Sequence, residues 1–190
     1  PMRADTRMQL RLEIGMIDQF DRVVELIERA RIPYVVLNDH LPHKELAAGK
    51  RPPSLTGQAL KARRSPEAHW ALMQEMHDRW EEVPNALAHL CAVLRQHGVL
   101  IGSHDDHTAA ERARAREIGA TLSEFPETAE AARAAHAAGE GVVMGAPNLV
   151  RGRSHAGKVA AADLVAEGLV DALASDYHYP APARAGFRLA

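Results

Sequence analysis

The sequence contains very little cysteine and few aromatic residues. Among its 190 residues there is one cysteine, Cys91, and aromatic side chains make up 4%. A single cysteine excludes a disulfide framework within the chain and is typical of a reducing compartment. No apolar run approaches the about 20 residues that a membrane-spanning helix needs, and no signal peptide is visible. We therefore expect a cytoplasmic localisation and no membrane partner.

An excess of charge of one sign is also missing. The formal net charge is −2, and no long basic or acidic block is present. This composition argues against nucleic acid as a partner. The share of apolar residues, 46%, and the length predict one globular domain over residues 1–190. The chain starts at Pro1 without a methionine and ends in GFRLA, which reads as helix, so we expect a piece of a longer protein.

Short apolar runs alternate with helical patterns along the chain. Strands are predicted at residues 9–14, 34–37, 99–103, 121–125, 142–144 and 170–174. The second strand is followed by a helical insertion at 41–98, with a long loop at 41–64 and helices at 66–80 and 84–96. Later helices are expected after Thr108, from Thr128 to Ala138, and at 157–167, with APNLVR as a connection. Such alternation predicts parallel strands joined by right-handed crossovers.

Two α/β architectures satisfy this alternation, an open doubly wound sheet and a (β/α)8 TIM-barrel. The polar residues favour the barrel, because a barrel brings all the carboxyl ends of its strands to one mouth. A doubly wound sheet uses only the ends near its switch point. We therefore expect about six βα units of a barrel. The residues that follow the predicted strands are Glu13, Asp39, His40, His104, Asp105, Asp106, Glu124, Asn148, Ser175 and Asp176.

The stretch GSHDDHT, residues 102–108, concentrates ionisable groups where a strand ends. An imidazole with a few carboxylates is the usual ligand set of a hydrolytic divalent metal. We expect zinc, manganese or magnesium as the cofactor. Asp105 and Asp106 are expected to orient His104. The alternative is a strand-end histidine satisfied by the backbone. The predicted metal ligands are Glu13, His40, His104 and Asp176, and Asp176 is also the predicted catalytic proton acceptor.

The stretch GRSHAGKVAA, residues 152–161, resembles a P-loop, with Gly152, Gly157 and Lys158. Val159 stands where a P-loop needs a hydroxyl for magnesium, so we reject an NTPase. Basic groups beside a helix start still favour anions. The predicted phosphate-binding residues are Arg151, His155 and Lys158, and the alternative is a solvated basic loop. A second basic stretch in the insertion is expected to be solvated or to form a lid; it contains Arg51, Lys61, Arg63 and Arg64.

Four runs occur in the order GSHDDHT, SEFPETAEAARAAHAAG, VVMGAPNLVRG and ASDY. Together they resemble the metal-dependent diphosphatases of the carbon–phosphorus lyase pathway of phosphonate metabolism, within the amidohydrolase superfamily. The resemblance covers nearly the whole chain. It implies a (β/α)8 barrel, of which this chain holds the third to eighth strands, with the insertion after the fourth. It also implies hydrolysis of a ribose 1-alkylphosphonate 5-triphosphate, a phosphorylated sugar, with release of pyrophosphate.

The chain departs from that superfamily in two features. The first-strand His-x-His or His-x-Asp is absent, and so is the small β-rich flank. Two other possibilities remain open. The first is that the protein is another amidohydrolase, such as a deaminase or a cyclic amidase. The second is that the chain is a catalytically silent barrel fragment. Such a fragment would form a homo-oligomer through the open barrel edges at residues 10–14 and 170–174.

Overall fold

The computed structural model describes residues 7–152, 157–175 and 177–189. Its six strands form one parallel sheet, as predicted, and their order in the sheet follows the chain. The α/β class is therefore confirmed. The strands are β1 (Gln9–Glu13), β2 (Tyr34–Asn38), β3 (Leu100–His104), β4 (Leu122–Glu124), β5 (Gly141–Gly145) and β6 (Ala172–Ala174).

The order of the strands bears on the choice between the two architectures. A doubly wound sheet reverses its strand order at a switch point, and the described part of the chain contains no such reversal. The sheet also curves. The Gln9 side chain in β1 donates to the Glu124 carboxylate in β4 at 2.9 Å, although three strand spacings span about 14 Å in a flat sheet. Both features are compatible with six consecutive strands of a barrel.

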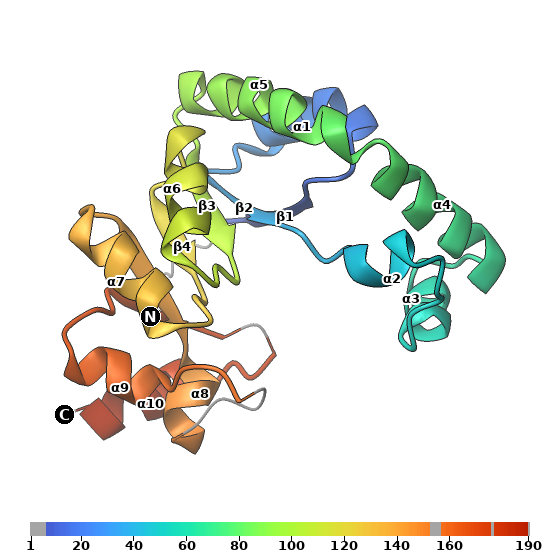
Figure 1. Cartoon of the computed structure of the whole chain (residues 1–190). Helices are drawn as coiled ribbons and strands as arrows, with labels where there is room; N and C mark the ends of the chain where they lie inside the picture. The colour runs from blue at the N-terminus through green and yellow to red at the C-terminus, as the bar shows by residue number, and fades with distance from the viewer. Residues whose placement is uncertain (1–6, 153–156, 176, 190) are drawn as a thin grey trace.

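Helices follow one another along one side of the sheet in chain order, from α1 and α5 through α6 to α7 (Figure 1). Helices α2, α3 and α4 extend away from that row in the same view. The helices are α1 (Phe20–Ala30), α2 (His43–Ala47), α3 (Leu55–Lys61), α4 (Pro66–Asp78), α5 (Val83–Gln96), α6 (Ala109–Glu117), α7 (Ala129–Ala137), α8 (Ala146–Arg151), α9 (Ala161–Ala166) and α10 (Ala181–Leu189), with 3₁₀ turns η1 (Ile17–Gln19) and η2 (Trp80–Glu82).

Local capping explains where several helices begin. The Ser65 hydroxyl accepts from the backbone N–H of Ala68 at 3.1 Å, directly before a proline in the first turn of α4. Thr108 and Glu111 form the predicted capping box of α6. A side-chain cap of this kind contributes about 1 kcal/mol, because it satisfies an N–H that has no partner inside the helix. These helix starts were predictable from the sequence, and they are confirmed.

Three predicted segments differ from the structure. The loop predicted at 41–64 is wrong, because it contains α2 and α3, whose Leu46 and Leu55 are buried with Met73 of α4. The connection APNLVR is wrong as well, since residues 146–151 form α8. The helix predicted at 157–167 begins at Ala161 instead, where the backbone N–H donates to the Asn148 side-chain oxygen.

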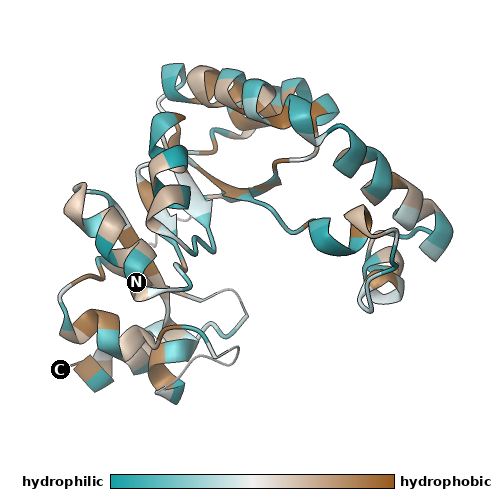
Figure 2. Ribbon diagram, viewed as in Figure 1, coloured by the Kyte–Doolittle hydropathy of each residue, from teal (hydrophilic) through white to brown (hydrophobic). Residues whose placement is uncertain are grey.

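The core lies between the strands and the helices that cover them. One cluster joins β1, β2 and β3 to α1 and α5, and a second joins β5 to α7, α8, α9 and α10. Figure 2 shows more hydrophobic colour along β2 and α5 than along α4. Each fully buried aliphatic side chain contributes about 1.5–3 kcal/mol. Helix α5 alone buries five residues, which are Val83, Leu87, Leu90, Cys91 and Leu94.

The other face of the sheet is polar, because side chains alternate between the two faces of a strand. Leu10 and Leu12 pack toward the helices, whereas Gln9 and Arg11 reach Glu124 across the opposite face. The concave face therefore carries ionisable groups that lead to the carboxyl ends of the strands. Within the described residues, no helix combines the length and apolar character needed to cross a membrane.

Candidate active site

Three of the predicted metal ligands lie at the carboxyl ends of neighbouring strands. Glu13 is the last residue of β1, His104 is the last residue of β3, and His40 follows the end of β2 by two positions. The three strands are parallel neighbours in the sheet, so their carboxyl ends meet at one edge. The imidazole rings of His40 and His104 have centroids 5.8 Å apart. Glu13 and His104, which are 91 positions apart in the chain, thus lie at the same edge of the sheet.

Glu13 and His40 form a hydrogen-bonded pair. Nδ1 of His40 lies 2.6 Å from Oε1 of Glu13, and the backbone N–H of His40 donates to Oε2 at 3.2 Å. Burial alone would raise the pKa of Glu13, but the hydrogen bonds and charge of His40 outweigh it and lower that pKa. The hydrogen bond from Glu13 correspondingly raises the pKa of His40. Since the carboxylate accepts at Nδ1, Nε2 is the ring nitrogen left to bind a ligand.

His104 has the same kind of partner. Its Nδ1 lies 3.0 Å from Oε2 of Glu124, the last residue of β4. The two side chains are 7% and 4% exposed, so this is a buried pair. Burial raises the pKa of Glu124, but hydrogen bonds from His104 and Gln9 and the positive charge of Arg11 outweigh it, and the pKa lies below its usual value. A carboxylate on one ring nitrogen orients a metal-binding histidine and favours binding through the other.

One group of donor atoms is suited to a cation. His40, His104 and Asp105 each offer a ligand atom, and the three atoms lie within 4.8 Å of one another. Nε2 of His104 is 3.6 Å from Oδ1 of Asp105. Two imidazoles and a carboxylate are a set that zinc and other divalent transition metals accept. The donor set therefore fits the divalent metal that the sequence predicts.

Asp105 reaches this position through an unusual backbone conformation. Its φ is 58°, in the left-handed region, which aspartate adopts more readily than most residues. Its backbone N–H donates to the carbonyl oxygen of Glu124 at 3.1 Å. This bond ties the turn after β3 to the end of β4. The turn thus holds the Asp105 carboxylate beside the ring of His104.

The structure gives some of these residues contacts that differ from their predicted roles. Glu13, predicted as a ligand, is hydrogen-bonded to His40, and Asp105, predicted to orient His104, is one of the three donors. Asp106 points elsewhere. Its Oδ2 is buried and accepts from the hydroxyls of Ser103 at 2.5 Å and Ser123 at 2.6 Å. The predicted roles at Asp176 and His155 fall outside the described residues.

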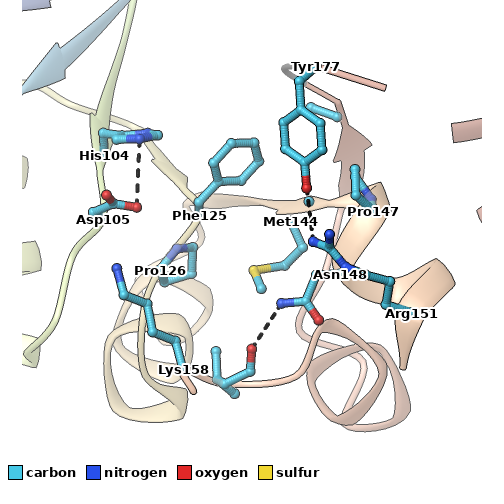
Figure 3. Close-up of a pocket in the computed structure, with 13 residues that line it drawn as sticks. His104, Asp105, Phe125, Pro126, Met144, Pro147, Asn148, Arg151, Lys158 and Tyr177 are labelled. Carbon is cyan, nitrogen blue, oxygen red and sulfur yellow. Dashed lines mark hydrogen bonds and ion pairs between the residues drawn. The ribbon is translucent and has the colours of Figure 1, made fainter. Parts of the chain in front are cut away.

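The predicted phosphate-binding residues that the structure describes line a cavity beside the donor group. The cavity has a volume of about 250 Å³ and is bounded by His104, Asp105, Arg151 and Lys158, among others (Figure 3). Arg151 donates to the Tyr177 hydroxyl at 2.9 Å. The ammonium of Lys158 pairs with the Glu127 carboxylate. Arg151 thus keeps a charge with no carboxylate partner among the described residues.

Sequence reasoning missed the role of Glu124 as the partner of His104, and it missed Gln9 and Arg11 as its neighbours. Arg11 donates to Oε2 of Glu124 at 2.8 Å. One signal pointed to this polar face: Gln9, Arg11 and Glu13 alternate with leucines along β1 and therefore share one side of the strand. Which residue they would meet across the sheet depends on its curvature, which no local pattern encodes.

Comparison with known proteins adds an independent finding. No family model matches the sequence. The chain is 34% identical over 197 residues to the alpha-D-ribose 1-methylphosphonate 5-triphosphate diphosphatase of Escherichia coli K12, covering 99% of this chain and 50% of that protein. The chain thus spans about half the length of the curated relative it matches. The resemblance predicted from the sequence motifs is confirmed: almost all of this chain is similar to part of that diphosphatase.

Proposed function

We propose that the protein containing this chain is a metal-dependent hydrolase that releases pyrophosphate from a ribose 1-alkylphosphonate 5-triphosphate. Residues 1–190 would supply one partial barrel domain of amidohydrolase type, with residues 41–98 as its insertion. The curved parallel sheet, in strand order, supports the barrel. The similarity to the Escherichia coli diphosphatase supports the substrate class. The chain spans about half the length of that relative, so the activity is proposed for the whole protein that contains it.

The observation that carries this proposal is the convergence of His40, His104 and Asp105 at one edge of the sheet. These three residues would hold the divalent ion. Glu13 and Glu124 accept from the Nδ1 atoms and so fix the two rings. A bound divalent ion would lower the pKa of a water molecule and neutralise charge on phosphate oxygens. The carboxylates on both rings, of which Glu124 is buried and Glu13 is partly exposed, keep the coordinating nitrogens oriented before the ion binds.

The reaction we propose is attack of water on the α-phosphorus. The water oxygen forms a bond to that phosphorus, and the bond from phosphorus to the oxygen that bridges to the β-phosphorus breaks. The electron pair of the broken bond leaves with pyrophosphate, and the proton of the water passes to a carboxylate. Asp176 remains the predicted acceptor. Arg151 and Lys158 would neutralise the departing charge, because phosphoryl transfer depends mainly on positioning and charge stabilisation.

Metal content and product release together test the proposal. The purified full-length protein, its His104→Ala variant and a His107→Ala control are analysed for bound zinc, manganese and magnesium and for pyrophosphate release. His107 is three residues from His104 but has a side chain 64% exposed. We expect His104→Ala to lower bound metal and to abolish release, and His107→Ala to preserve both.

Two results would contradict the proposal. If His104→Ala bound as much metal as the wild type, the donor group would not be the metal site. If the wild type hydrolysed a panel of cyclic amides but not the ribose 1-methylphosphonate 5-triphosphate, the protein would be another amidohydrolase. Circular dichroism of each variant establishes that its fold is intact.

A further inference from the structure

A second cavity lies on the other side of the donor group. It has a volume of about 900 Å³ and is lined by Glu13 and His40 at one end and by residues of α3 and α4 at the other. This volume falls within the range of small-molecule sites, about 300–1,000 Å³. Helices α2, α3 and α4, which extend from the end of β2 (Figure 1), have a small core of their own. The insertion therefore forms a packed wall beside the site.

Two buried polar atoms in this wall have no partner among the described residues. They are Oε1 of Gln58 and Nδ1 of His69, and both residues line the cavity. A buried polar atom without a hydrogen bond costs about 1–3 kcal/mol. A ligand hydroxyl can donate to the amide oxygen and also pair with the imidazole nitrogen. Because both atoms are closed to solvent, these side chains would have to turn toward the cavity to bind a ligand, and a ligand that carries hydroxyl groups, such as a sugar, would then satisfy them.

The same cavity carries charged side chains of both signs and an apolar wall. Two of its carboxylates are paired, Glu13 with His40 and Asp18 with Arg79, and Glu75 also lines it. Lys61 and Arg64 line it, and neither side chain has a partner in the described part of the chain. The apolar part of the lining includes Leu72, Met73 and Met76. Methionine adapts to irregular apolar groups because its side chain is unbranched and flexible. A ligand with a small negative charge next to an alkyl group matches these two features.

We propose that this larger cavity holds the ribose and its alkylphosphonate ester, and that the leaving pyrophosphate occupies the smaller cavity beside Arg151. The donor group lies between the two, since Glu13 and His40 line the larger cavity and His104 and Asp105 line the smaller one. The scissile phosphorus must lie at the donor group, so its sugar and pyrophosphate substituents extend to opposite sides. This inference rests on the proposed function and assigns the substrate's orientation and the residues that select it.

The test compares two substrates that differ only in the phosphonate. The KM of the full-length protein is measured with ribose 1-methylphosphonate 5-triphosphate and with ribose 5-triphosphate. Replacing Lys61 and Arg64 together by alanine is expected to raise the first KM about tenfold or more, the effect of losing one charge-assisted hydrogen bond. The second KM should stay unchanged. Arg151→Ala should raise both.

The matched control is Arg63→Ala, because Arg63 is adjacent to Arg64 in sequence but does not line the cavity. It should change neither KM. The orientation is overturned if the double variant raises both KM values equally, or if Arg63→Ala has the same effect. Calorimetric binding of ribose 1-methylphosphonate 5-phosphate gives a readout that does not depend on turnover.

The binding measurement separates the two proposals. In one outcome the wild type binds this compound but releases no pyrophosphate from the triphosphate, and the double variant does not bind it. This outcome would refute the proposed function and retain the cavity assignment. A wild type that turns over the substrate, with equal product binding by the double variant, would refute the assignment alone. Failure of both turnover and binding in the wild type would refute both.

Discussion

Replacing Arg112 by methionine tests how much the buried ion pairs behind the site contribute to stability. Arg112 has no exposed surface. Its guanidinium donates to Glu140 at 2.6 Å, to the Ser103 hydroxyl at 2.5 Å and to Asp106 at 3.3 Å. The residue thus joins α6, in which it lies, to the turn after β3 and to the residue before β5.

The expected loss follows from what methionine leaves behind. The apolar side chain fills part of the space but donates no hydrogen bond, so Asp106 and Glu140 lose a buried cationic partner. Removing one member of a buried ion pair costs about 3–5 kcal/mol, out of the about 5–15 kcal/mol that stabilise a typical domain. At about 2–4 °C per kcal/mol for a chain of this size, the Tm should fall by about 6–20 °C.

Arg116→Met is the matched control, because Arg116 also donates to Glu140 at 2.6 Å but is 43% exposed. Water reaches the Arg116 side of this pair, which weakens it toward the about 1 kcal/mol of a surface pair, so this variant should lose fewer degrees than Arg112→Met. Thermal and urea unfolding followed by circular dichroism measure both variants. Equal losses in the two would show that burial does not decide the strength of these pairs, and the reasoning would be refuted.

Two further predictions concern titratable groups. Burial raises the pKa of Glu140, but the hydrogen bonds and charges of Arg116 and Arg112 outweigh it and lower that pKa in the folded state. Its contribution to stability should therefore be complete above the unfolded pKa of about 4.3 and be lost as the pH falls through the folded pKa. The urea midpoints of the wild type and of Glu140→Gln should converge at low pH. A difference that stays constant with pH would contradict this. Burial raises the pKa of the Cys91 thiol to about 11, so a disulfide reagent at pH 8 should leave it unmodified until the chain unfolds, and rapid modification of the native protein would show that Cys91 is accessible.

Much of the fold was predictable because its signals are local. The alternation of polar and apolar residues before Glu13, the apolar run before His104 and the capping box at Thr108 each depend on residues a few positions apart. Helices α2, α3 and α8 were missed for a related reason. They have five, seven and six residues, too few to show a clear helical period, and helices this short are stable only through packing. Leu46 and Leu55 acquire that packing from Met73.

In the candidate site, some features follow from local sequence and others only from the folded chain. Strand-end positions alone identified Glu13, His40 and His104 as residues that would meet, because parallel strands place their carboxyl ends at one edge. The partners within the site came only from the folded chain. Curvature brings the Glu124 carboxylate in β4 to Gln9 in β1, and the left-handed turn at Asp105 moves its carboxylate in among the histidines.

The amino-acid order alone thus determined which segments form strands and helices, and at which end of the strands the reactive groups lie, since both depend on short-range periodicity and on backbone direction. Only the tertiary structure decided which carboxylate orients each imidazole and that two cavities flank the donor group. Those features depend on sheet curvature and on the packing of the insertion. Both result from contacts between residues far apart in the chain, up to 115 positions for Gln9 and Glu124.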